Sequence, residues 1–398
     1  MSDVNLTDTI YLDHAATTPL DPDVLRVMSP FLASEYGNPS SVYSLGQASH
    51  AALDGARSTI AGILGCDAGE LIFLGGATES VNLVLSGVAW AARLRDPAGP
   101  WPHIVTTAIE HSAVLESARW LERIGFGLTI VPCDAEGRVD PAVIAAAIQP
   151  ETCLVSVMLA NNEVGTIQDL PAIAAICAER DVVLHSDATQ AAGSLALDVD
   201  ALSVDLMTLS AHKFYGPKGV GLLYVRNGTD LAWQQRGGGQ ESGRRGGTEN
   251  VAGIVGMAAA LERAERFRPA YARHCAGLRD RLLAGLQDRL PDVRLNGPPT
   301  GADRLPNNLN IVLPGVQGET VLLALDMEGV AASAGSACTV GRNEPSHVLE
   351  AMGLDEAATR ASVRLTTGRG NSPEQIEDAI DVIVSVVNRT RALGGARP

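Results

Sequence analysis

The sequence predicts an α/β protein, with a mostly parallel sheet covered by helices on both faces, followed by a smaller α+β region. Short apolar runs rich in Val, Ile and Leu alternate with helical patterns between residues 71 and 225. These runs are continuously apolar rather than alternating in polarity, which is typical of strands buried on both faces. Near residue 249 the pattern changes to a long helical stretch, and this change indicates a second region.

The first region is expected to contain strands joined by helices. The strands are expected at 71–75, 103–107, 128–132, 153–159, 182–187, 204–210 and 220–225. The helices between them are expected at 78–95, 112–124, 140–148 and 169–180. Strands that alternate with helices in this way indicate βαβ units, in which neighbouring strands run parallel.

The second region begins with the helical stretch from residue 249, where Pro269 is expected to cause a kink because proline lacks the N–H that a helix needs. Strands are then expected near 308–313, 330–333 and 362–366, and helices near 317–328 and 373–392. We therefore expect a large domain of residues 16–265 and a small domain formed by residues 1–15 and 266–398.

Composition narrows the possible functions. The chain has 398 residues, of which 46% are apolar and 19% charged, as in globular proteins with a core to bury. Its net charge of −16 argues against nucleic acid binding, which relies on basic side chains. The N-terminus lacks the features of a signal peptide, and no apolar run is long enough to span a bilayer. We expect a cytoplasmic protein that binds neither nucleic acid nor membrane.

The six cysteines form no Cys-x-x-Cys pair and no metal-ligand spacing, so free thiols and no metal site are expected. Most of them lie in apolar segments, where cysteine behaves as a small hydrophobic residue. Cys338 differs, because it lies in AASAGSACTVG among small residues that offer little to pack against.

Both lysines of the chain lie in TLSAHKFYGPKGVG, residues 208–221, and the other 28 of its 30 Lys and Arg residues are arginine. Arginine can replace lysine as a solvated cation, but it cannot lose its proton and form a Schiff base. Either two surface lysines survived by chance, or one of them is needed as an amine. Lys213 directly follows a strand, whereas Lys218 lies in a glycine-rich turn, so Lys213 is the stronger candidate.

Polar side chains follow five of the expected strands. Ligands of open α/β sheets bind at the carboxyl ends of the strands, so these side chains should meet at one edge. Each could instead be a helix cap or turn residue, but that explanation is weak for all of them together. They are Thr78, Glu110, His111, Asn161, Asn162, Glu163, Asp187, Gln190, Ser210, His212 and Lys213.

This combination fits a pyridoxal phosphate site. The glycine turn and helix start within 71–83 could bind a phosphate through free N–H groups, with Ser210 and His212 as further donors. Asp187 could pair with a protonated ring nitrogen, and Lys213 could hold the cofactor covalently.

Long segments resemble the class V aminotransferase superfamily and, more narrowly, the cysteine desulfurases that supply sulfur for iron–sulfur clusters. They include YLDHAATTPLDPDV, GNPSSVYSLG, FLGGATESVNL, TTAIEHSAV, NNEVGTIQDL, HSDATQAAG, DLMTLSAHKFYGPKGVGLLYVR, GGGQESGRRGGTENV, SAGSACTVGRNEPSHVLEAMG and SVRLTTGR. The resemblance runs from residue 10 to about 385. It implies a fold-type I pyridoxal phosphate homodimer with a large and a small domain.

The resemblance also implies a role for each site residue. Lys213 would hold the cofactor, His111 would stack on its ring and move protons, and Cys338 would accept sulfur. Arg364 would bind the substrate carboxylate near Asn162, with Arg369 as a rival in the same motif. The remaining cofactor contacts would be the Ala77 backbone, Thr78, Ser210, His212 and Thr248 of the partner subunit at the phosphate, Asp187 at the ring nitrogen, and Gln190 and Asn162 at the phenolic oxygen.

The implied reaction converts L-cysteine to L-alanine and places the sulfur on Cys338 as a persulfide, for transfer to an acceptor such as an iron–sulfur scaffold protein. One alternative is a selenocysteine lyase or another class V aminotransferase-like enzyme, although Cys338 argues against plain transamination. A second alternative is a non-catalytic, cofactor-binding regulator. The presence of Lys213, His111, Asp187 and Cys338 together argues against it.

Overall fold

The computed structural model describes residues 9–334 and 345–394. Its main sheet has seven strands in the order β2-β8-β7-β6-β5-β3-β4. From β7 to β4 all neighbours are parallel, whereas β8 is antiparallel to both β7 and β2. The prediction of a mostly parallel sheet is therefore confirmed. The strands are β2 Leu71–Leu74, β3 His103–Thr107, β4 Gly127–Val131, β5 Thr152–Ser156, β6 Val183–Asp187, β7 Leu206–Ser210 and β8 Gly221–Val225.

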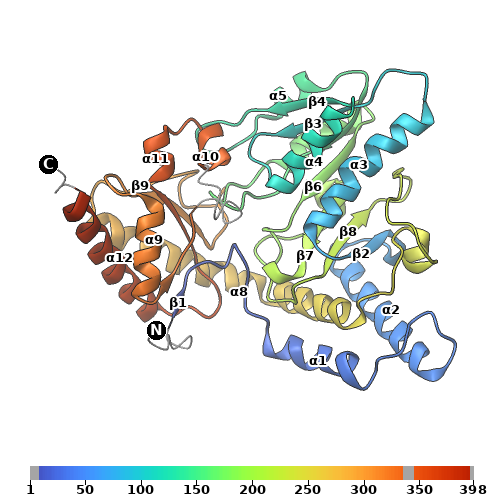
Figure 1. The fold of residues 1–398 in the computed structure, drawn as a ribbon, viewed down its shortest axis with the longest axis horizontal. Helices are drawn as coiled ribbons and strands as arrows, with labels where there is room; N and C mark the ends of the chain where they lie inside the picture. The colour runs from blue at the N-terminus through green and yellow to red at the C-terminus, as the bar shows by residue number, and fades with distance from the viewer. Residues whose placement is uncertain (1–8, 335–344, 395–398) are drawn as a thin grey trace.

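Helices cover both faces of this sheet (Figure 1). On β2, Ile72 and Leu74 belong to one hydrophobic cluster with residues of α3 (Ala77–Arg95) and α4 (Ser112–Arg123). Leu71 and Phe73 belong to a second cluster with residues of α2 (Ser44–Leu64), α6 (Leu170–Glu179) and α8 (Val251–Arg289). Because successive strand residues point to opposite faces, both faces need apolar side chains, which explains the continuous apolar runs. The remaining helices of this region are α1 Pro22–Ala33, α5 Pro141–Ala147, α7 Val199–Leu202, η1 Ala68–Glu70, η2 Ala211–Lys213 and η3 Gln240–Gly243.

The second region is built on a three-stranded antiparallel sheet in the order β12-β10-β9. Beside it, β1 (Ile10–Tyr11) pairs in parallel with β11 (Val330–Ala331), which ties the N-terminal segment to this region. A third hydrophobic cluster joins these strands to α9, α12 and the later part of α8. The other elements are β9 Arg294–Leu295, β10 Asn308–Val312, β12 Ser362–Thr366, α9 Gly318–Met327, α10 His347–Ala351, α11 Glu356–Arg360 and α12 Pro373–Gly394.

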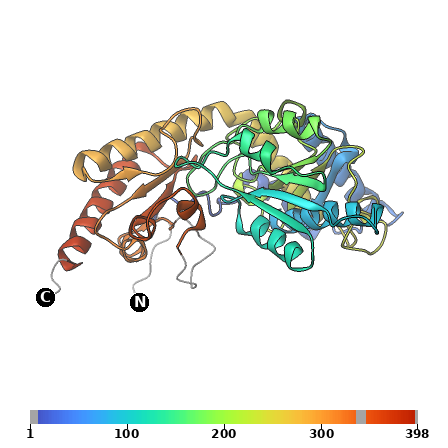
Figure 2. The same cartoon turned by 90° about the horizontal axis from the view of Figure 1, so that it is seen from above.

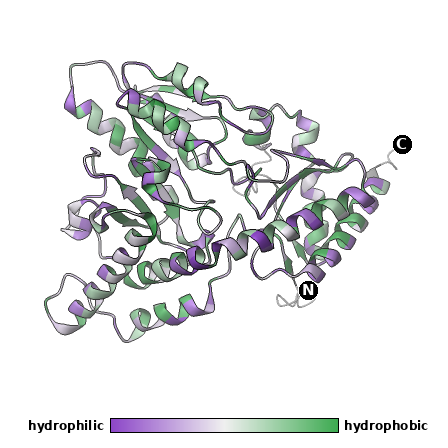
Figure 3. Ribbon diagram, turned by 180° about the vertical axis from the view of Figure 1, so that it is seen from behind, coloured by the Kyte–Doolittle hydropathy of each residue, from purple (hydrophilic) through white to green (hydrophobic). Residues whose placement is uncertain are grey.

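One helix, α8, runs along both sheets (Figures 1 and 2). It is a single element across Pro269, so the proline does not end it. Figure 3 shows hydrophobic and hydrophilic residues mixed along α8 and α12, as expected for helices with one face on a core. The predicted domain boundary after residue 265 falls inside α8, and it stays a prediction.

Two further features concern the described residues. No helix among them is both long and apolar enough to cross a membrane. The cysteines that the structure describes are all free thiols, as the sequence predicted, and they are Cys66, Cys133, Cys153, Cys177 and Cys275.

Candidate active site

The carboxyl ends of four adjacent parallel strands form one edge of the main sheet. His111 follows β3, Asn162 follows β5, Asp187 ends β6 and Ser210 ends β7. The turn after β2 reaches the same edge, because Gly221 at the start of β8 pairs in register with the last residues of both β2 and β7. The fold therefore brings together the strand ends that the sequence singled out.

Lys213 ends the short helix η2, directly after β7. Its Nζ donates hydrogen bonds to the backbone carbonyls of Ala15 (2.6 Å) and Ala16 (2.9 Å). Gln190 Nε2 donates to the same Ala15 oxygen at 2.9 Å, so Lys213 and Gln190 converge on the N-terminal segment. Lys218 is exposed in the turn before β8.

His111 is the N-cap of α4, and its Nδ1 accepts a hydrogen bond from Ala113 N at 3.1 Å. Burial lowers the pKa of His111, and it outweighs the opposing charge of Asp187. The charge of Lys213 lowers this pKa further. The imidazole is therefore neutral at pH 7 and lies within electrostatic reach of both Asp187 and Lys213.

Asp187 is 6% exposed at the end of β6, and its Oδ1 accepts a hydrogen bond from Thr189 N at 2.9 Å. Ser156, His185 and Thr208, from three adjacent strands, form a buried row of hydrogen bonds beneath this edge. Burial lowers the pKa of His185 to about 4, so this row adds no charge beside Asp187.

The turn between β2 and α3 is suited to a phosphate. Gly76 is the N-cap of α3 and has no side chain, so no side-chain cap covers the first N–H groups of this helix. A Cβ added to Gly221 would lie 2.6 Å from the backbone of Gly76, so a glycine at 221 is needed for the turn to pack there. Thr78 is exposed in the first turn of α3.

Two further predicted phosphate ligands, Ser210 and His212, lie close to Lys213 in the chain. Ser210 is buried at the end of β7, and His212 lies two residues on, with Nδ1 3.1 Å from Thr17 Oγ1. Burial, together with the charges of the two lysines, lowers the pKa of His212 to about 4. His212 would therefore act as a neutral hydrogen-bonding group.

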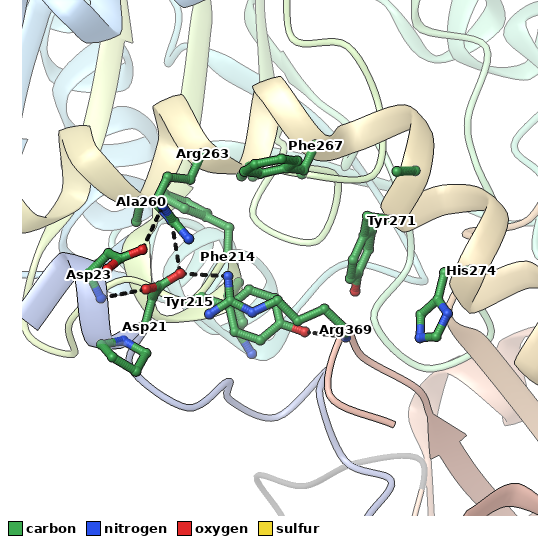
Figure 4. Close-up of a pocket in the computed structure, with 16 residues that line it drawn as sticks. Asp21, Asp23, Phe214, Tyr215, Ala260, Arg263, Phe267, Tyr271, His274 and Arg369 are labelled. Carbon is green, nitrogen blue, oxygen red and sulfur yellow. Dashed lines mark hydrogen bonds and ion pairs between the residues drawn. The ribbon is translucent and has the colours of Figure 1, made fainter. Parts of the chain in front are cut away.

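The structure separates the two rival arginines. Arg364 on β12 is 1% exposed, and it donates to the Asn162 carbonyl (2.9 Å) and to Asp13 Oδ1 (2.8 Å). Arg369 pairs instead with Asp21 at 2.7 Å, in a cavity of about 520 Å³ shown in Figure 4. Arg364, and not Arg369, therefore lies beside Asn162.

Sequence reasoning assigned no role to two groups at this edge. Asp13 lies in the YLDHAATT segment and forms an ion pair with the buried Arg364. Glu110 was identified as a strand-end residue, but not as a fully buried acid whose burial raises its pKa to about 8. The backbone carbonyls of Ala15 and Ala16 have no sequence signal, because any residue carries one.

Two predicted residues have no described contact with this edge. Thr248 is exposed in the segment between η3 and α8. Cys338 lies outside the described residues.

Known proteins are similar to this chain over nearly its whole length. The family model "Aminotransferase class-V" matches residues 10–378. "Cysteine desulfurase IscS" of Clostridium botulinum is 43% identical over 384 residues, covering 96% of each chain. Among solved structures, a "NIFS-LIKE PROTEIN" superposes with a TM-score of 0.89 at 35% identity, over 96% of this chain and 100% of the other. The structure "SspA in complex with cysteine" has a TM-score of 0.76 at 34% identity, over 90% and 99%.

The fold and the edge that carries Lys213 define a class V aminotransferase, and the chain belongs to this family. Within the family it belongs to the cysteine desulfurases, which its extended identity to curated members shows.

Proposed function

We propose that this protein converts L-cysteine to L-alanine with bound pyridoxal 5'-phosphate and places the sulfur on Cys338 as a persulfide. The proposal is supported by the strand ends that bring Lys213, His111 and Asp187 to one edge of the sheet, where His111 lies within electrostatic reach of both Asp187 and Lys213. The persulfide would then pass to an acceptor such as an iron–sulfur scaffold protein.

The residues present fit this cofactor. The uncapped start of α3, with the Ala77 backbone and Thr78, would hold the phosphate together with Ser210 and His212. Gln190 and Asn162 would contact the phenolic oxygen, and the buried carboxylate of Asp187 would keep the ring nitrogen protonated. When bound, the cofactor withdraws electrons from the substrate Cα, which makes the Cα proton acidic and weakens the Cβ–S bond.

Lys213 has two tasks in this proposal. Its Nζ would hold the cofactor covalently until the amine of cysteine replaces it, and would then take the proton from Cα. The carbonyls of Ala15 and Ala16 fix the direction of the side chain through two hydrogen bonds. An amine held at a defined place needs little reorganisation to reach Cα, which favours the transfer.

His111 and Arg364 would orient the substrate. His111 is neutral because of its burial, so its imidazole can accept a proton from the substrate and return it later. The guanidinium of Arg364 is held by Asp13 and by the Asn162 carbonyl, and this support favours a fixed contact with the substrate carboxylate.

The transfer of sulfur to Cys338 needs no added oxidant. The thiolate of Cys338 attacks the substrate sulfur, the S–S bond forms and the Cβ–S bond breaks. The electron pair of the broken Cβ–S bond stays on Cβ, and Cβ then takes a proton and becomes the methyl group of alanine. Burial raises the thiol pKa of each described cysteine well above the ordinary value, to between about 11 and about 12, which makes these thiols poor nucleophiles.

A homodimer would complete the site, with Thr248 of the partner subunit at the phosphate. Large apolar side chains are exposed on α1 and the segment before α2, where Leu32 is 65%, Tyr36 72% and Val42 86% exposed. Such a group supports burial against another subunit.

The test is to add L-cysteine to the purified, cofactor-loaded protein and to measure alanine and sulfide. Wild type should form alanine and a persulfide on Cys338, Cys338→Ser should form neither beyond background, and Cys66→Ser should match wild type. Alanine formed independently of residue 338 would remove the acceptor assignment. A much higher rate with selenocysteine than with cysteine would favour the selenocysteine lyase alternative.

A further inference from the structure

The backbone beside Lys213 has an unusual conformation. Tyr215, two residues after Lys213, has φ = +66°, in the left-handed region that aromatic residues rarely adopt. A residue with a Cβ is strained in this region, so surrounding contacts must maintain the conformation.

Contacts on every polar group of Tyr215 maintain this conformation. Its N–H donates to Thr18 Oγ1 at 2.7 Å, and its carbonyl accepts from Asp21 N at 3.0 Å. Its Oη accepts from the backbone N–H of Arg369 at 2.9 Å. The Arg369 guanidinium also covers the ring, with Cζ 3.9 Å from the ring centroid.

Arg369 is itself held by a buried acid. Its Nη1 lies 2.7 Å from Asp21 Oδ2, and the Asp21 side chain is only 4% exposed. Arg263 Nε, from α8, reaches the same oxygen at 3.0 Å, as Figure 4 shows. Asp21, Tyr215 and Arg369 therefore form a linked set, called the lysine brace below.

The brace borders a cavity. Lys213, Phe214 and Tyr215 line this cavity of about 520 Å³, although Phe214 and Tyr215 are themselves buried. Protein cores usually fix a backbone by close packing on all sides. On the side of the cavity, charged and aromatic contacts take the place of that packing (Figure 4).

We propose that Asp21, Tyr215 and Arg369 are positioning residues that hold the turn after Lys213 in place. The inference rests on the proposed role of Lys213. Arg369 then acts on the reaction through the backbone of the turn and does not contact the substrate carboxylate.

The experiment compares Arg369→Gln and Asp21→Asn with wild type and with Arg281→Gln, which breaks an exposed ion pair with Glu377. Two quantities are measured: kcat and KM for cysteine in the loaded enzyme, and the rate at which the apo protein takes up pyridoxal phosphate covalently. Uptake is followed by visible absorbance, and borohydride trapping identifies the peptide that contains Lys213.

Both brace variants should lower kcat and slow covalent uptake about tenfold, with KM within about twofold, because a misplacement of about 1 Å can cost about a hundredfold. Arg281→Gln should match wild type. Tyr215→Phe keeps the ring and loses only the Oη contact, so it should slow uptake about threefold even where the charge variants fold poorly.

A raised KM in Arg369→Gln alone, with unchanged kcat and uptake, would overturn the inference and indicate a substrate contact. Unchanged kinetics in all three variants would also overturn it. Failure of wild type to trap cofactor at Lys213 would instead refute the proposed function, so the two failures can be told apart.

Discussion

Replacing the buried acid Glu110 by glutamine should change how the stability of the protein depends on pH. Glu110 is 0% exposed, and its Oε1 accepts from Thr107 Oγ1 (2.8 Å) and Met158 N (2.9 Å). Its Oε2 has no hydrogen-bond partner among the described residues. Burial raises the pKa of Glu110 from 4.5 to about 8, and the charge of Asp187 adds to the increase. The side chain is therefore protonated at pH 7 in the folded protein.

The direction in which stability changes with pH follows from how many protons the folded and unfolded states bind. Between the unfolded pKa of 4.5 and the folded pKa of about 8, the folded protein keeps a proton that the unfolded chain releases. Stability must therefore fall as pH rises through this window. Each unit of pKa difference is worth about 1.4 kcal/mol, so the loss between about pH 5.5 and about pH 8.5 is about 3 kcal/mol.

Glu110→Gln keeps the shape and the acceptor oxygen but cannot ionise. The free energy of unfolding of wild type minus that of the variant should therefore decrease by about 3 kcal/mol between those two pH values. This free-energy difference is measured by urea unfolding of both apo proteins at one fixed protein concentration. The contributions of the other titrating groups are the same in both proteins and cancel.

The matched control is Glu116→Gln, whose exposed carboxylate pairs with Arg119 on α4. For this variant, the free energy of unfolding of wild type minus that of the variant should change by less than about 1 kcal/mol between the same two pH values, because exposed ion pairs contribute little. If this free-energy difference changed equally little with pH for Glu110→Gln, Glu110 would be ionised in the folded protein and the reasoning would be refuted.

Three further outcomes are expected. Gly221→Ala should weaken cofactor binding at least tenfold in a titration of the apo protein, because its Cβ would lie 2.6 Å from the Gly76 backbone; equal affinity would contradict the packing argument. Arg364→Lys should raise KM for cysteine about tenfold or more, because lysine cannot make a bidentate carboxylate contact; an unchanged KM would place the carboxylate elsewhere. Leu282→Ala, at a 0% exposed position, should lower the free energy of unfolding in urea by about 2–5 kcal/mol, and a loss below about 1 kcal/mol would be inconsistent with its burial.

Much of the main sheet could be predicted from the sequence, because a strand covered on both faces needs apolar side chains on both of them, which gives short apolar runs. β3, β7 and β8 are buried throughout, and their runs were predicted to within a few residues. β1, β9 and β11 have two residues each, which is too few to show the periodic pattern of apolar residues that identifies a strand. The helix α8 continues as one element across Pro269, with buried residues on both sides of the proline, and the kink expected there stays a prediction.

The chemical types of the site residues were also predictable, because an imidazole, a carboxylate and an amine lie at the carboxyl ends of three of the strands, β3, β6 and β7. Their separation could not be predicted, since it depends on strand order. β3 and β5 are neighbours although β4 lies between them in the chain, and this order places His111 near Asp187.

The amino-acid sequence alone was enough to identify Lys213 as an amine at a strand end and the apolar runs as a sheet with two covered faces. The different surroundings of Arg364 and Arg369, five positions apart in one motif, became visible only in the folded chain. Their acidic partners, Asp13 and Asp21, lie near the other end of the chain. Such pairs are set by how segments far apart in the chain pack together, and local periodicity carries no information about that packing.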